Sequence, residues 1–238
     1  NIGTLGVQGA VEKTLIHTTP EPITLHKTLT ELVEFGVQHA SLEASSHGLE
    51  QWRLDGVVLQ AAAFTNLSRD HLDYHYNQKK YLEAKCLLFD RVLPIGKIVV
   101  LNFDDPNIEP ILAICDRRHH QVIKVGYKSG ADIQICDQRF YPDGQIITFS
   151  YLGNSRTIKL SLIGDFQAMN ILMAATLVIA LGAEPNKVFD SLPNLHSVPG
   201  RMYLVDSPDR DVNVYVDYAH TPDALSKSLK ALRLHTIG

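Results

Sequence analysis

Residues 61–105 read AAAFTNLSRDHLDYHYNQKKYLEAKCLLFDRVLPIGKIVVLNFDD, and this stretch decides the fold. It opens with a short apolar run, residues 61–64, that predicts a strand. A helix is expected from about Gln78 to Arg91, because apolar side chains recur at helical spacing and Asn77 can cap the first turn. A second strand is expected at 97–101. Strand, helix and strand in this order predict a parallel pair with a helix covering one face of a sheet.

The same alternation continues on both sides of this unit. Upstream, helical spacing from Glu21 to Phe35 is followed by a short strand predicted from Val37 to Glu43. Downstream, a helix is expected from Pro106 to Cys115 and a strand from Val122 to Val125. This order is typical of an α/β fold with a mainly parallel, doubly wound sheet.

The pattern changes after residue 131. Short alternating strands over residues 132–162, with the turn signal Pro142-Asp143-Gly144, predict a small antiparallel β subsheet. Apolar helices are expected from Gln167 to Leu181 and from Glu184 to Leu192.

The last part of the chain starts a new strand and helix. Residues 207–210 are a candidate linker, and a strand from Val212 to Asp217 precedes a helix from about Pro222 to Leu234. We therefore predict one domain over residues 1–204 and the beginning of another over residues 205–238.

The composition excludes several classes of protein. The 238 residues are 45% apolar, which is enough to bury a core, and 22 basic against 26 acidic residues give a net charge of -4. This balance argues against a nucleic-acid surface or a polybasic membrane anchor, and no apolar run approaches the roughly 20 residues that cross a bilayer. Cys86, Cys115 and Cys136 form no CxxC pair, so a reducing, cytoplasmic setting is expected.

Polar residues gather where two predicted strands end. Glu43 is followed by two serines and His47, and the later cluster holds Asp70, His71, Asp73 and His75. In doubly wound sheets this edge is where ligands bind. Each group can also be explained without a function. A single acid is usually solvated, Asp can cap a helix, and His can pack in the protein with its nitrogens hydrogen-bonded.

Together these motifs resemble the Mur ligase family. Within it they are most similar to the enzymes that add the third amino acid of the peptide. The matches follow the family order over nearly the whole chain and are Thr18-Thr19-Pro20, Glu43 to Leu49 with Gln51 and Arg53, Phe64 to His75, Lys85, Asn102 with Asp104-Asp105, Gly164 with Asn170, Gly200-Arg201-Met202, and Asp217 to Leu225.

The resemblance implies a bacterial, cytoplasmic ligase of cell-wall peptidoglycan synthesis that uses ATP and Mg²⁺. ATP phosphorylates the free carboxylate of UDP-N-acetylmuramoyl-L-alanyl-D-glutamate, and the amine of a diamino acid then displaces phosphate from the acyl phosphate. The selecting motif lies outside this chain, and the added residue is expected to be meso-diaminopimelate, the commoner choice in the family, and otherwise lysine. A monomer without membrane insertion or nucleic-acid partners is implied.

The resemblance also implies residue roles. The metal positions are Glu43, His71 and Lys85, where Lys85 is the lysine that CO₂ converts to a carbamate. The positions that hold the UDP-muramoyl peptide are Thr18, Thr19, Ser45, Gln51 and Arg53. The ATP-binding positions are Asn170, Arg201, Asp217 and His220.

The phosphate-binding G-x-x-G-K-[ST]-type loop of the family has no match in this sequence. In the family, the glycine-rich residues 3–9 lie downstream of that loop. We therefore expect the chain to be a piece of the ligase that is inactive by itself.

Two readings from other classes remain open. One is a metal-dependent hydrolase that uses Asp70, His71, Asp73 and His75, although further ligands would have to come from elsewhere. The other is a non-catalytic relative that binds nucleotide.

Overall fold

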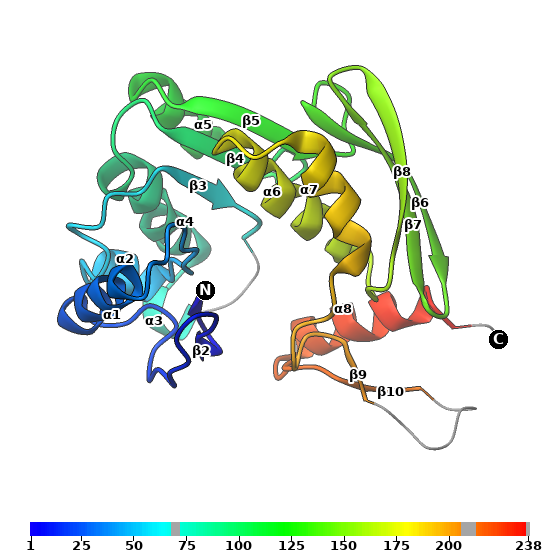
Figure 1. The fold of residues 1–238 in the computed structure, drawn as a ribbon, viewed down its shortest axis with the longest axis horizontal. Coiled ribbons are helices and arrows are strands. Elements are labelled where there is room, and N and C mark those ends of the chain that lie inside the picture. The colour runs from blue at the N-terminus through cyan, green and yellow to red at the C-terminus, as the bar shows by residue number, and fades with distance from the viewer. Residues whose placement is uncertain (68–71, 206–212, 237–238) are drawn as a thin grey trace. The chain divides into compact units, whose positions relative to one another are not determined.

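The computed structural model describes residues 1–67, 72–205 and 213–236 (Figure 1). The structure is α/β, as predicted, and divides into two compact units. The first comprises Asn1–Ala62, Leu67–Val99 and Glu109–Gln121, and the second comprises Ala63–Asn66, Val100–Ile108 and Val122–Gly238. None of the helices in the described part of the chain is long and apolar enough to cross a membrane.

The first unit is mainly helical. Its elements are the short strands β1 (Ile2–Gly3) and β2 (Gly6–Val7) and the helices α1 (Pro22–Glu34), α2 (Ser46–Glu50), α3 (Leu72–His75), α4 (Gln78–Leu87), the π-helix η1 (Leu88–Val92) and α5 (Glu109–Arg117). Its core is built from side chains that are almost completely buried, among them Leu25, Leu49, Leu54, Phe89 and Ile111. Helix α2 packs against α4, and α5 packs against η1.

A six-stranded sheet in the order β3-β4-β5-β6-β7-β8 organises the rest of the chain. Its strands are β3 (Ala61–Phe64), β4 (Ile98–Asn102), β5 (Gln121–Gly126), β6 (Ile133–Tyr141), β7 (Gly144–Tyr151) and β8 (Asn154–Leu160). Strand β5 pairs with β6 in parallel, whereas β6, β7 and β8 form an antiparallel meander, green in Figure 1. The predicted antiparallel strands are confirmed, but they extend the main sheet rather than form a separate one.

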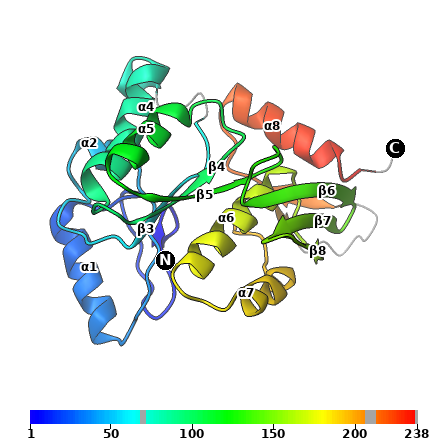
Figure 2. The same cartoon turned by 90° about the horizontal axis from the view of Figure 1, so that it is seen from above.

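Helices α6 (Phe166–Ala180) and α7 (Pro185–Ser191) lie side by side in the second unit (Figure 2). Phe189 of α7 packs on Phe149 of β7, with ring centroids 5.0 Å apart. The chain continues through the 3-10 turn η2 (Leu192–Asn194), the antiparallel pair β9 (Tyr203–Val205) and β10 (Val214–Val216), and α8 (Pro222–Arg233). The candidate linker at residues 207–210 lies outside the described residues.

One predicted strand is absent, and two predicted helices differ from the structure in detail. Residues 37–43 form no strand, because their described backbone pairing is a single parallel bridge from Leu42 to Ile2. The helix expected from Pro106 begins at Glu109, after a turn in which the Asp105 carboxylate accepts a hydrogen bond from Asn107 N. The helix expected over 78–91 changes to a π-helix at Leu88.

Asn77 caps α4 as predicted, since its Oδ1 accepts a hydrogen bond from Lys80 N at 2.9 Å. Replacing Asn77 by alanine leaves this amide without its partner, and we expect the free energy of unfolding to fall by about 1 kcal/mol. In a protein of this size that is a decrease in Tm of about 2–4 °C. Thermal unfolding of N77A beside N77S, which keeps a capping oxygen, checks this; equal losses in the two variants would contradict it.

Candidate functional site

Glu43 is held beside the N-terminal hairpin of the first unit. Ile2 accepts a hydrogen bond from Glu43 N and donates one to Ser41 O, which fixes the backbone here. The Glu43 carboxylate accepts from Thr4 at both oxygens, at 3.2 Å from the amide and 2.9 Å from the hydroxyl. A Cβ on Gly3 would lie 2.3 Å from Glu43 Oε1, so a side chain at position 3 would displace the carboxylate from this orientation. Glu43 is therefore exposed but oriented, and sequence analysis missed Thr4 as its partner.

The threonine pair has two different environments. Thr19 is 1% exposed, and its hydroxyl donates to Glu43 O at 2.7 Å and accepts from Ser45 N at 2.9 Å. Thr18 Oγ1 lies 3.2 Å from Thr4 Oγ1. Thr19 thus connects the backbone of Glu43 to the start of α2, while Thr18 lies beside the hydroxyl that orients the Glu43 carboxylate.

Ser45 is the N-cap of α2, and its Oγ accepts a hydrogen bond from Gly48 N at 3.0 Å. Beyond α2, Arg53 donates to Thr19 O at 2.9 Å and to Gln51 Oε1 from both Nε and Nη2. Because a guanidinium has five N–H donors, these bonds leave one N–H on each terminal nitrogen of Arg53, which is 9% exposed. The structure therefore brings Thr19, Ser45, Gln51 and Arg53 into one hydrogen-bonded group.

Gly48 leaves no room for a side chain, since an added Cβ would lie 2.7 Å from Thr19 Cγ2 and 3.0 Å from Ser45 Oγ. We expect G48A to lower the free energy of unfolding by about 1–3 kcal/mol through overpacking. Thr19→Ser removes the methyl at 2.7 Å and keeps the hydroxyl, but Thr19 Cβ, at 2.8 Å, stays in place. Chemical denaturation should show part of the loss recovered in G48A/T19S, and a double variant no more stable than G48A would contradict this explanation.

Lys85 lies on α4, half-buried, with Nζ 5.6 Å from the centroid of the Tyr81 ring. Burial lowers the pKa of the Lys85 ammonium, and the negative charge of Glu43 opposes that decrease. The two residues therefore interact electrostatically although 42 positions separate them in the sequence. Because the pKa is lowered, Lys85 loses its proton more readily than a lysine in water.

The donor atoms around Glu43 suit a hard cation. Mg²⁺ prefers oxygen ligands and is usually bound through one or two carboxylates together with water and substrate phosphates. One oriented carboxylate with the hydroxyls of Thr4 and Thr18 nearby is compatible with that preference. His71 lies outside the described residues, and within those residues no group of three or more His, Cys, Asp or Glu side chains could hold a metal.

The residues predicted to approach ATP belong to the second unit. The Asp217 carboxylate accepts from Met202 N at 3.0 Å, from Ala219 N at 2.8 Å and from Ser228 Oγ at 3.1 Å. These bonds connect the end of the β9–β10 pair to the middle of α8. His220 is exposed, with Nδ1 2.8 Å from Tyr218 O. Arg201 is also exposed, 6.0 Å from the centroid of the Tyr218 ring.

Asn170 is exposed on α6. The structure thus gathers Arg201, Asp217 and His220 around one strand pair. Only Asp217 among them has its polar atoms engaged by several backbone and side-chain partners.

His75, which the hydrolase reading treats as a metal ligand, is buried instead. It is 2% exposed, and its Nε2 lies 2.8 Å from Ser46 Oγ. Residues 68–71 and the side chain of Asp73 lie outside what the structure describes. From the sequence, His75 was predicted only as part of a dense polar cluster. No pattern in the sequence indicates its contact with Ser46.

Comparison with known proteins gives consistent results. The Mur ligase middle domain matches residues 1–178. The UDP-N-acetylmuramoyl-L-alanyl-D-glutamate--2,6-diaminopimelate ligase of Zymomonas mobilis is 42% identical over 240 residues, covering 100% of this chain and 49% of that protein. Its counterpart in Caulobacter vibrioides is 40% identical over 245 residues, covering 100% and 50%. This chain therefore spans about half the length of the curated relatives it matches.

Solved structures agree with the sequence comparison. A structure of a ligase with the same name has a TM-score of 0.82 and 33% identity, covering 96% of this chain and 46% of that one. MurF ligase from Thermotoga maritima in complex with ADP has a TM-score of 0.64 at 24% identity, covering 79% and 41%, which indicates a shared fold.

Proposed function

The chain belongs to the Mur ligase family, and from this premise we propose that it is the middle part of an enzyme that joins 2,6-diaminopimelate to UDP-N-acetylmuramoyl-L-alanyl-D-glutamate. Relatives named for this reaction align with all of the chain at about 40% identity. In the proposed reaction the terminal phosphoryl group of ATP passes to the free carboxylate. The amine of diaminopimelate then attacks the acyl phosphate, and phosphate leaves as the amide forms.

The arrangement of Glu43 and Lys85 carries this proposal. Phosphoryl transfer depends mainly on positioning and on charges that neutralise the phosphate oxygens. Bound Mg²⁺ would supply that positive charge, and Glu43 with His71 and Lys85 are the residues that would hold it. Lys85 would do so as a carbamate, formed when its neutral amine adds to CO₂ and releases a proton. The lowered pKa of Lys85 supports this step, because burial makes the neutral amine accessible.

The hydrogen-bonded group around Arg53 suits the muramoyl peptide. Its guanidinium is fixed by Gln51 and Thr19, and the two N–H donors that remain can bind a carboxylate or phosphate oxygen. The Ser45 hydroxyl accepts from Gly48 N and keeps its own proton for a ligand. We assign Thr18, Thr19, Ser45, Gln51 and Arg53 to this substrate, with Thr19 acting by holding Arg53 and Ser45 in place.

On the nucleotide side we assign Asn170, Arg201, Asp217 and His220. Arg201 and His220 are exposed and can reach a ligand, while Asp217 orders the backbone around them. We retain residues 1–204 as the ATP-handling domain and 205–238 as the beginning of the next domain.

The test is amide formation by the protein that contains this chain. Purified protein is incubated with ATP, Mg²⁺, UDP-N-acetylmuramoyl-L-alanyl-D-glutamate and either meso-diaminopimelate or lysine, and products are identified by mass. We expect the tripeptide product and ADP only when all components are present, with diaminopimelate preferred. Preference for lysine would correct the amino acid, and hydrolysis of ATP without amide formation would overturn the proposal.

A further inference from the structure

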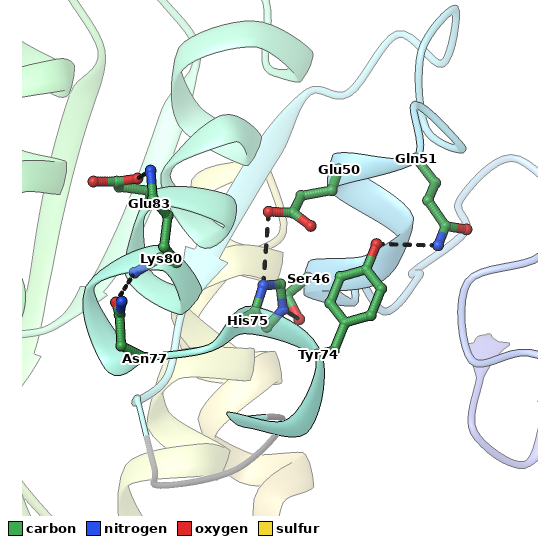
Figure 3. Close-up of polar contacts among 8 residues, drawn as sticks. All are labelled: Ser46, Glu50, Gln51, Tyr74, His75, Asn77, Lys80 and Glu83. Atoms are coloured by element: carbon green, nitrogen blue, oxygen red, sulfur yellow. Dashed lines mark hydrogen bonds and ion pairs between the residues drawn. The ribbon is translucent and has the colours of Figure 1, made fainter.

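His75 connects two functional segments of the first unit and has no role in the reaction described so far. It is the last residue of α3, and its imidazole is almost completely buried. Its Nε2 lies 2.8 Å from Ser46 Oγ and its Nδ1 lies 3.6 Å from Glu50 Oε1, so both ring nitrogens face α2 (Figure 3). The same ring stacks on Tyr81 of α4, with centroids 5.2 Å apart and planes at 22°.

The elements that His75 joins carry groups assigned to different parts of the reaction. Helix α2 follows its cap Ser45 and leads to Gln51 and Arg53, the residues assigned to the muramoyl peptide. Helix α4 carries Lys85, whose Nζ lies over the same Tyr81 ring on which His75 stacks. One buried imidazole therefore contacts both the helix next to the substrate group and the helix of Lys85.

The neighbouring Tyr74 adds a second connection between α3 and the substrate group. Its hydroxyl accepts a hydrogen bond from Gln51 Nε2 at 3.3 Å (Figure 3). The centroid of its ring lies 3.9 Å from that of the His47 ring. Gln51 in turn accepts from Arg53. Side-chain contacts thus run without a break from Tyr74 of α3 through Gln51 to the Arg53 guanidinium, so a shift of α3 would move that guanidinium.

Ser46, His75 and Glu50 are arranged like the serine, histidine and carboxylate of a hydrolytic triad, but the burial of Ser46 and His75 excludes catalysis of hydrolysis. Ser46 is 1% exposed, and its hydroxyl faces the imidazole inside the protein, so no substrate can reach it. Burying a hydroxyl and an imidazole is costly unless they bond to each other, and a bonded pair of this kind fixes one geometry. The arrangement therefore suits a structural link between elements whose relative position matters.

We propose that His75 is a positioning residue of the ligase, which fixes α2 relative to α4 and so sets the substrate-binding group in register with Lys85. The inference rests on the function proposed above. A displacement of about 1 Å between reacting groups can reduce a rate about 100-fold, so a small shift of α2 is enough to matter.

Two substitutions separate the contacts of His75 in the protein that contains this chain. His75→Gln places an amide near the position of Nε2 and keeps a partner for Ser46, whereas His75→Asn ends near Nδ1 and loses that partner. We expect H75N to reduce kcat by about 10- to 100-fold and H75Q by less than about 5-fold. KM for ATP should change by less than about 3-fold in both, because the residues assigned to the nucleotide belong to the second unit.

Ser46→Ala provides an independent route to the same contact if H75N folds poorly. Both substitutions remove the same hydrogen bond, the one between Ser46 Oγ and His75 Nε2. The kcat of S46A/H75N should therefore be no more than about 2-fold below that of H75N alone. His120→Asn is the matched control: His120 is also buried, and its Nε2 lies 2.9 Å from Phe89 O, a backbone atom of η1. It should lower Tm with kcat within about 2-fold of the unsubstituted enzyme.

Equal kcat losses in H75N and H120N, or a Tm decrease in H75N with unchanged kcat, would overturn the positioning role. Independent, multiplying effects of S46A and H75N would also overturn it. A failure of the proposed function is distinguished by the unsubstituted protein, which would then form no amide at all.

Discussion

Lys85→Arg is expected to reduce kcat of the ligase that contains this chain by about 100-fold or more, the range seen when a preorganised charge at a reacting centre is removed. Arginine keeps the positive charge and nearly the length of lysine but stays protonated, so it cannot add CO₂. The burial that lowers the pKa of Lys85 has no comparable effect on a guanidinium. Steady-state release of phosphate with all substrates present measures the loss.

Lys80→Arg is the control for this experiment, because Lys80 lies on the same helix, is exposed and pairs with Glu83 at 2.7 Å. It should leave kcat within about 2-fold, as expected for a surface ion pair. A direct readout is ¹³C NMR in ¹³C-bicarbonate, where a carbamate signal should be present in the unsubstituted protein and in K80R and absent from K85R. Full activity of K85R would remove Lys85 from the mechanism.

Glu43→Gln is expected to raise the Mg²⁺ concentration for half-maximal activity by about 10- to 100-fold and to lower kcat by about 100-fold. The substitution is conservative in shape, since the amide oxygen of glutamine can still accept a hydrogen bond from Thr4. It removes the negative charge that would hold the cation. The experiment is a Mg²⁺ titration of the initial rate at saturating substrates.

Glu31→Gln is the matched control for the loss of a carboxylate, because Glu31 is bonded to Lys13 at the surface of the same unit. Its Mg²⁺ titration should overlay that of the unsubstituted enzyme, and its Tm should change little. If E43Q and E31Q give the same titration, Glu43 is not a metal ligand. A lower kcat in E43Q without a shift in Mg²⁺ dependence would instead indicate that Glu43 orients the substrate.

Local chemistry explains which elements could be predicted. The spacing of apolar residues in α1, α6 and α8 and the capping oxygen of Asn77 are properties of a few neighbouring residues, and these elements lie close to their predicted bounds. The resemblance to the family was carried by motifs in the chain itself, and the matches to its middle domain and to its diaminopimelate ligases confirm it.

Predictions that depended on distant partners were less accurate. A strand needs a neighbour, and residues 37–43 have one bridge to Ile2 instead of a ladder. The antiparallel strands β6–β8 were predicted as a small subsheet, but no local pattern shows that β6 pairs in parallel with β5.

The sequence by itself determined the α/β class, the order of most helices and strands, and the family, because each depends on short-range patterns and on motifs written in the chain. The tertiary structure decided which side chains meet. Thr4 reaches Glu43 across 39 positions, and His75 reaches Ser46 across 29. Such contacts form only when the folded core brings distant segments together, since no local preference of either residue specifies its partner.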